Sequence, residues 1–191
     1  MPKEIIVLGL ASLFMDISSE MIHALLPVFM VTLLGSNATI VGIIEGLGEG
    51  LALIVRVFSG ALSDWLARRK HLILIGYLLG TFSKPLFAIA TASGMVMFAR
   101  ALNRIGKGIR SAPLDALVAD SVGESVRGTA FGIYGLATGC VIIIASIFAG
   151  WLWDQYGTPM TFYAGVGFSL LTLFALPLVT RALPEKSGLD L

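Results

Sequence analysis

The sequence predicts an all-α polytopic membrane protein, and three observations lead to this fold class. Hydrophobic residues make up 57% of the 191-residue chain, and the mean hydropathy is +0.91. Only 13% of the residues are charged, about half the usual share in a soluble domain. The apolar residues also gather in stretches close to the ~20 residues that a helix needs to cross a bilayer. These features exclude a soluble globular domain.

Six stretches are apolar enough to cross the membrane as helices. They cover approximately residues 5–34, 39–62, 72–92, 94–112, 128–152 and 161–180. Glycine, serine, asparagine and proline supply turns at 35–37, 93–94 and 157–159. The first stretch is longer than the apolar core of a signal peptide, so we interpret it as a retained span. We expect a single six-helix bundle over residues 1–191 with a short cytoplasmic tail at 183–191.

Basic residues indicate the orientation of this bundle. The connections at 35–38, 93–94 and 153–160 contain no Lys or Arg, whereas the segments at the other end of the spans are basic. Those segments hold Lys3, Arg68, Arg69, Lys70, Arg110, Arg127, Arg181 and Lys186. By the positive-inside rule, both termini are expected to be cytoplasmic, in an inner membrane. The net charge of +1 gives no basic surface for nucleic acid.

The chain also contains a candidate internal repeat. Shifting the sequence by 90 positions aligns residues 58–64 with 148–154, with four of seven residues identical, and Gly42-Ile43 with Gly132-Ile133. We interpret this as the duplication of a three-helix unit, with repeats at approximately 1–92 and 94–182. Because three spans is an odd number, the second copy is inverted, as in many secondary transporters. A chance match is the alternative, since Gly and Phe are common in membrane helices.

A motif between the second and third predicted spans is the most specific feature. It reads GALSDWLARRK over residues 60–70 and resembles the signature cytoplasmic loop of the major facilitator superfamily. The matching residues are Gly60, Leu62, Ser63, Asp64, Arg68, Arg69 and Lys70. Trp65 and Ala67 depart from the pattern. The resemblance implies a cytoplasmic gate in which Asp64 pairs with the basic residues and Asp120 pairs with Arg68. A topology anchor is the alternative interpretation of the basic cluster.

The fourth predicted span strengthens the resemblance. Arg100, Gly106 and Gly108 fall where the superfamily's arginine-and-glycine helix has them. In the fifth span Cys140 replaces the proline of the antiporter signature. The resemblance covers the whole chain but only half of a superfamily member, which usually has twelve spans. It implies alternating-access transport of a small molecule, with the second half supplied by a homodimer or a separately encoded partner.

Nine ionisable residues lie inside the predicted spans, where each costs roughly 2.5–3.5 kcal/mol near the bilayer centre. They are Asp16, Glu20, Glu45, Glu49, Arg56, Lys84, Arg100, Arg104 and Lys107. Spacings of three and four residues arrange most of them in two acidic stripes and one basic stripe, which can close a network. We expect Asp16 and Arg104 to form a central substrate or proton site with Glu20, Glu45, Glu49 and Arg100 around it. A purely structural ion-pair cluster is the alternative, and we expect Lys84 to snorkel toward the membrane surface.

The rest of the sequence offers little further chemistry. Cys140 lies in an apolar run, where we expect a buried, inert thiol. The sequence has no cofactor motif, no metal-ligand spacing and no catalytic triad, so we do not expect an enzyme. We predict that the chain is half of a secondary transporter with a proton-coupled mechanism such as symport. The alternatives are a multidrug exporter and a truncated or accessory membrane bundle that transports nothing.

Overall fold

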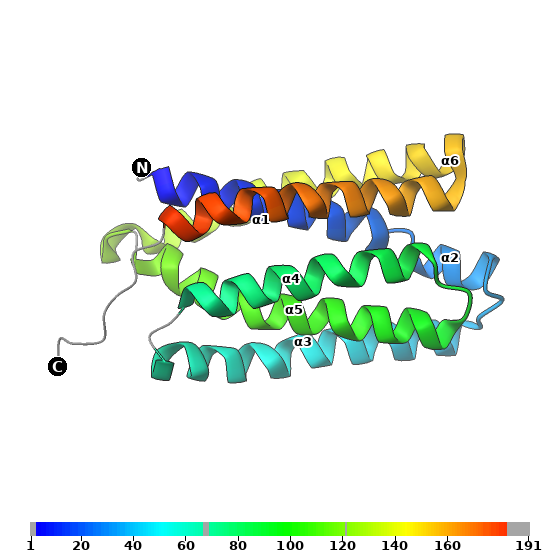
Figure 1. Cartoon of the computed structure of the whole chain (residues 1–191), viewed down its shortest axis with the longest axis horizontal. Coiled ribbons are helices and arrows are strands. Elements are labelled where there is room, and N and C mark those ends of the chain that lie inside the picture. Colours follow the sequence, from blue (N-terminus) through cyan, green and yellow to red (C-terminus); the bar gives the residue numbers. More distant parts are fainter. Residues whose placement is uncertain (1–2, 67–68, 121, 183–191) are drawn as a thin grey trace.

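The computed structural model describes residues 3–66, 69–120 and 122–182, and all the regular elements in these ranges are helices. They are α1 (Lys3–His23), α2 (Leu26–Thr32), α3 (Ala38–Leu66), α4 (Arg69–Ala88), α5 (Ser93–Asp120), the 3-10 helix η1 (Glu124–Val126) and α6 (Arg127–Ala182). The long helices lie side by side along the longest axis of the molecule (Figure 1). The all-α class is confirmed.

Proline and glycine determine where the helices break. Pro27 has no N–H to donate to the carbonyl of His23, and here α1 ends and α2 begins. Gly157 has φ 77° and ψ 177°, which is not helical, and α6 turns back on itself there (Figure 1). The predicted spans at 128–152 and 161–180 therefore lie in the two arms of α6. The number of membrane crossings and the inverted repeats stay predictions.

Within the described residues, four helical stretches are long and apolar enough to cross a membrane. They are Gly9–Thr32, Ala38–Trp65, Arg69–Ala88 and Arg127–Leu176. The highly charged α5 is not among them and packs instead between α3 and α4. The helix α5 continues to Asp120, beyond the predicted fourth span at 94–112.

Glycines bring α5 into backbone contact with both neighbours. A Cβ atom added to Gly76 of α4 would lie 2.7 Å from the carbonyl oxygen of Gly106 in α5. A Cβ atom added to Gly108 would lie 2.7 Å from the carbonyl oxygen of Ala52 in α3. Small residues permit this close approach of helices in a membrane. The helices α3, α5 and α4 consequently form one tightly packed layer.

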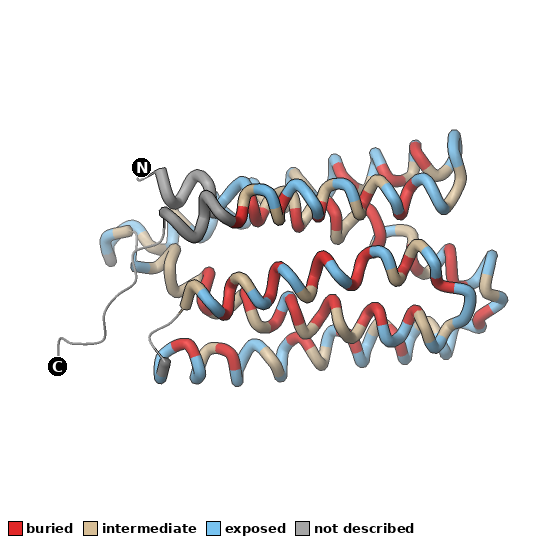
Figure 2. The backbone as a smooth tube through the Cα atoms, in the orientation of Figure 1, coloured by how far each residue is buried: buried red, intermediate tan, exposed pale blue. Residues whose placement is uncertain are grey.

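A second layer consists of α1 and α6, which pack mainly against each other, and α4 also contacts α6. The outer faces of α3 and of the first arm of α6 are apolar and exposed, with Phe58 72% and Ile147 69% exposed (Figure 2). Cys140 is also exposed, so the expectation of a buried thiol is wrong. An apolar run does not indicate burial in a helix whose outer face contacts lipid.

Candidate functional site

A polar stripe on α1 faces the layer of α3, α4 and α5. Ser12, Asp16, Ser19 and His23 are spaced by four, three and four residues, which places them on one helix face. The Ser12 hydroxyl lies 2.7 Å from the Tyr77 hydroxyl, and the Lys84 ammonium donates to the Ser19 hydroxyl at 2.9 Å. The boundary between the two layers is therefore polar inside an otherwise apolar bundle.

Arg100 occupies the centre of this polar region. Its side chain is only 2% exposed and forms ion pairs with Glu45 and, at 3.7 Å, with Glu49. Glu49 also pairs with Arg104. Gly48 makes room for the arginine, because a Cβ atom there would lie 3.0 Å from Arg100 Cγ. The structure thus brings together four of the residues that the sequence assigned to the site.

The ion-pair cluster leaves some buried polar atoms without a hydrogen bond. Within the described part of the chain, Glu45 Oε1, Arg100 Nε and Arg104 Nε have no partner. Such groups are costly unless water or another partner satisfies them. The network therefore has capacity for further hydrogen bonds.

His23 connects Arg100 to α4 through a directional chain of hydrogen bonds. A guanidinium only donates, so His23 Nδ1 must accept from Arg100. The other ring nitrogen, Nε2, then donates to Asn103 Oδ1 at 3.0 Å. Asn103 Nδ2 donates to the Ser83 hydroxyl at 3.0 Å, which donates to the Gly80 carbonyl at 2.6 Å. The whole chain requires a neutral His23 with its proton on Nε2.

Lys84 is fully buried, so the prediction that it snorkels is wrong. Pro85 follows it inside α4, but the lysine side chain points to α1 rather than along the helix to the membrane surface. No carboxylate lies within ion-pair distance of Lys84 among the described residues; its hydrogen bond is to Ser19. The hydroxyl of Ser19 takes the place of the interface water that a snorkelling lysine would reach.

Asp16 does not pair with Arg104, contrary to the sequence prediction. Its carboxylate lies 3.5 Å from Arg110, which is 5% exposed and stacks 5.1 Å from the centre of the Tyr77 ring. The sequence placed Arg110 among the basic residues at the cytoplasmic ends of the spans, whereas the structure buries its side chain next to Asp16. Glu20 is half-buried and has no ion pair within the described residues.

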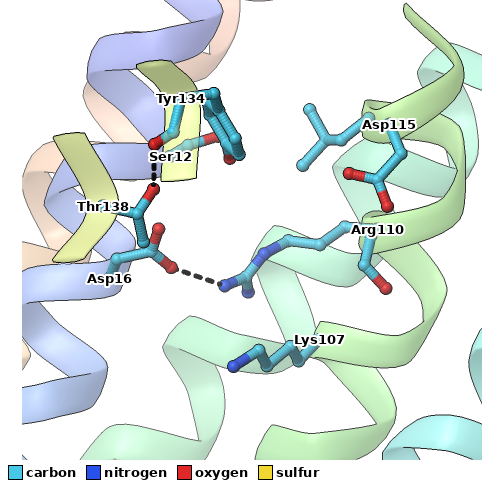
Figure 3. A pocket seen from close by; sticks show the side chains of 9 residues that line it. Ser12, Asp16, Lys107, Arg110, Asp115, Tyr134 and Thr138 are labelled. Carbon is cyan, nitrogen blue, oxygen red and sulfur yellow. Dashed lines mark hydrogen bonds and ion pairs between the residues drawn. The ribbon is translucent and has the colours of Figure 1, made fainter. Parts of the chain in front are cut away.

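Asp16 and Arg110 line a pocket of about 160 Å³ between α1, α5 and α6. Figure 3 shows the two side chains pointing toward one another, with Lys107 beside them on α5. The complete lining is Ser12, Asp16, Lys107, Arg110, Ser111, Leu114, Asp115, Tyr134 and Thr138. This pocket is the candidate ligand site nearest to the polar stripe of α1.

The predicted gate motif lies where α3 ends and α4 begins. Arg69 forms an ion pair with Asp120 at 2.6 Å. The sequence predicted Arg68 as the partner of Asp120, but Arg68 lies outside the described residues. Asp64 is exposed and forms no ion pair with Arg69 or Lys70, whereas its predicted pairing with Arg68 lies outside the described residues. The structure therefore ties the cluster to the end of α5.

The remaining motif residues differ in their surroundings. Gly60 packs against α5, since a Cβ atom there would lie 3.5 Å from Ala112 Cβ, an ordinary contact. Leu62 is 40% exposed, and Lys70 is half-buried. Among the described residues, no group of three His, Cys, Asp or Glu side chains is arranged to hold a metal ion.

Two functional candidates escaped the sequence analysis. No role was assigned to His23 from the sequence, although its spacing of seven from Asp16 places it on the same face of the helix. Arg110 is three residues from Lys107, which extends the basic stripe of α5 by one turn. Helical spacing was thus the signal for both.

Comparisons with known proteins identify relatives of the whole chain. The family model described as Major Facilitator Superfamily matches residues 8–190. An uncharacterized MFS-type transporter of Methanocaldococcus jannaschii is 37% identical over 132 residues, which cover 69% of this chain and 32% of that protein. The multidrug resistance protein MdtH of Photorhabdus laumondii subsp. laumondii is 26% identical over 150 residues, covering 78% of this chain and 37% of that protein. The chain therefore spans about a third of the length of these curated relatives.

Solved structures share the fold. A mutant of the peptide transporter POT in complex with alafosfalin superposes with a TM-score of 0.76 at 19% identity, covering 95% of this chain and 39% of that one. The POT family transporter PepTSo superposes with a TM-score of 0.71 at 17% identity, covering 98% of this chain and 40% of that one. At these identities the likeness concerns the arrangement of the helices.

Proposed function

Because the chain belongs to the major facilitator superfamily, a family of membrane transporters rather than enzymes, we propose that it forms part of a secondary transporter. In this proposal it moves a small solute across the inner membrane by alternating access, coupled to protons. The single observation that carries the proposal is the network around Arg100, in which two buried arginines of α5 pair with glutamates of α3, a helix apolar enough to cross a membrane. Ionisable groups at such depth are expensive and mark substrate or proton pathways.

The coupling step in this proposal is a competition for arginine. A proton bound to Glu45, Glu49 or Asp16 would neutralise that carboxylate and weaken its ion pair. The released arginine would then be free to take another partner when the layers rearrange. Arg100, Arg104 and Arg110 each have a carboxylate partner of this kind.

We further propose six membrane crossings arranged as two inverted repeats. Counting α1 with α2 as one crossing and the two arms of α6 as two gives this number. Support comes from the helix bounds: a shift of 90 residues moves Lys3, the start of α1, onto Ser93, the start of α5. The same shift moves the start of α3 to within one residue of the start of α6.

The orientation of the bundle can be tested by labelling. The start of α1, the end of α3, the start of α4 and the end of α5 lie at one end of the molecule (Figure 1), and we propose that this end is cytoplasmic. In a background without Cys140, single cysteines at positions 37 and 156 should react with an impermeant reagent added outside, and those at 69 and 125 should not. Labelling of a cysteine at position 69 from outside would show that the proposed orientation is wrong.

We also propose that a second copy or a separately encoded half completes the transporter. The chain covers 32% of its M. jannaschii relative, and the open faces of α3 and α6 are available for such a partner. The mass of the particle in nanodiscs measures this directly. Two copies support the homodimer, whereas a stable 20.2-kDa monomer without a recovered partner argues for the accessory bundle.

The test of function is uptake into proteoliposomes with an imposed pH gradient. A solute screen should find accumulation that collapses with the gradient and is lost in Arg100→Gln. Asp154→Asn, which removes an exposed charge far from the network in sequence, should behave as the parent chain. Normal uptake by the Arg100→Gln variant would show that the network around Arg100 is not needed for transport.

A multidrug exporter is the second candidate, and the likeness to the multidrug resistance protein of P. laumondii favours it. In that case apolar organic cations should compete with the transported solute. If these cations do not compete at concentrations at which a small anion competes, the multidrug exporter is excluded and the transporter of a small solute is supported.

A further inference from the structure

The pocket beside Asp16 has one more positive charge than its carboxylates balance. Arg110 pairs with Asp16 at 3.5 Å, and Asp115 pairs with Arg56 at 2.6 Å. Lys107 also lines the pocket, and no carboxylate lies within ion-pair distance of it in the described part of the chain. The ammonium of Lys107 is therefore the uncompensated charge at this site.

The two cations are placed to act together. Lys107 and Arg110 are three residues apart on α5, so they share one face of the helix. Figure 3 shows both side chains extending from α5 toward the α1 side of the pocket, with Arg110 joined to Asp16. An entering anion would gain both cations while competing with one carboxylate that Arg110 already contacts at a long distance. An entering cation would find both lining carboxylates already paired, Asp16 with Arg110 and Asp115 with Arg56, and would be repelled by Lys107.

The size of the pocket limits the ligand. Its volume is about 160 Å³, whereas sites for drug-sized ligands typically measure about 300–1,000 Å³. A cavity of ~150 Å³ accommodates a single benzene molecule. The Tyr134 ring and Leu114 supply apolar surface within the same lining.

We infer that this pocket binds a small organic anion of about the size of benzoate, with its acidic group held by Lys107 and Arg110. The inference depends on the proposed transport function only in naming this anion as the class of transported solute. An anionic lipid headgroup has the same recognition chemistry, so the experiment must separate a free anion from a lipid.

The experiment measures binding without transport. The full chain is placed in phosphatidylcholine nanodiscs, and saturation-transfer NMR is used to titrate three probes that share a phenyl ring: benzoate, benzamide and phenyltrimethylammonium. We expect saturable binding of benzoate, at least about tenfold weaker binding of benzamide, and none of the cation, because ionised acceptors bind donors about twice as strongly as neutral ones. Equal binding of benzoate and benzamide would overturn the inference.

Substitutions test the assigned residues. Lys107→Gln should raise the dissociation constant for benzoate by about tenfold, since a hydrogen bond to a charged group is lost, whereas Lys107→Arg should retain binding. Lys107 is exposed, so neither variant should change the unfolding midpoint. Asp16→Asn should tighten benzoate binding because it removes the competitor for Arg110, and Asp154→Asn should not. Unchanged binding in Lys107→Gln would refute the assignment.

Two further outcomes separate the remaining possibilities. Adding phosphatidylglycerol to the nanodiscs should leave benzoate binding intact; its loss would make the pocket a lipid site and overturn the assignment to a solute. Benzoate binding in a chain that fails every uptake assay would keep this inference and remove the transport proposal. Uptake of a solute without any benzoate binding would overturn this inference and keep the transport proposal.

Discussion

The ion pair between Arg100 and Glu45 provides the sharpest test of the energetics. Arg100 is 2% exposed and Glu45 is 31% exposed. Arg100→Gln removes the pairs with both glutamates and the contact to His23, so we expect a loss of about 3–5 kcal/mol in the free energy of unfolding. Glu45→Gln leaves Arg100 with Glu49 and His23, and the expected loss is about 1–3 kcal/mol.

The double variant decides whether the two residues act as a pair. Once Arg100 has been replaced, replacing Glu45 no longer breaks an ion pair with it. The loss in the free energy of unfolding of the double variant should therefore be smaller than the sum of the two single losses by about 1–3 kcal/mol. The matched control is the exposed pair of Arg69 and Asp120, whose side chains are 28% and 46% exposed. Its coupling should be about 0.2–1 kcal/mol because solvent screens it.

Reversible unfolding in bicelles, followed by circular dichroism while the denaturing detergent is increased, measures both cycles. Losses at Arg100 and Glu45 that add to within about 0.5 kcal/mol would refute the reasoning. A coupling no larger than that of the exposed pair would do the same, since burial is the stated cause.

The other predictions concern packing, the histidine and coupling. Gly76→Ala should destabilise the chain by about 1–3 kcal/mol, because its Cβ would meet Arg110 Cβ at 2.7 Å; Gly42→Ala, with open space around it, should be neutral or slightly stabilising in the same unfolding assay. His23→Leu should cost about 1–3 kcal/mol because Arg100 and Asn103 lose their partner, whereas the amide of His23→Gln can accept from one and donate to the other; equal losses would contradict the hydrogen-bond direction. Asp16→Asn should permit solute exchange in proteoliposomes but abolish accumulation driven by a pH gradient, and accumulation at the parent level would exclude Asp16 as the coupling group.

The sequence was sufficient for the fold class and for the polar cluster. Hydrophobic stretches and turn residues predicted helices close to those observed, because lipid forces every backbone group to bond within its own helix. The cost of charge in lipid likewise predicted that Glu45, Glu49, Arg100 and Arg104 would gather together. Both inferences depend on the solvent and need no knowledge of how the helices pack.

The individual ion pairs could not be predicted from the sequence, because they depend on how the helices pack. Asp16 and Arg104 were expected to form one site, but a sequence does not give the rotation of α1 against α5, and Asp16 meets Arg110 instead. The end of α5 was missed for a related reason. Charged residues such as Asp115 and Asp120 look like a loop in sequence, yet they belong to the helix α5 and pair with Arg56 of α3 and Arg69 of α4.

The glycine contacts of α5 restrict how this helix can move. Gly106 and Gly108 are two residues apart, which corresponds to about 200° around the helix axis, and they touch α4 and α3 on nearly opposite sides. Any twist of α5 about its own axis would replace a glycine at one of these contacts with a residue that has a side chain, and the backbones could no longer meet. These two contacts therefore restrict rotation of α5 about its own axis. A displacement of α5 would also carry its neighbours α3 and α4 with it.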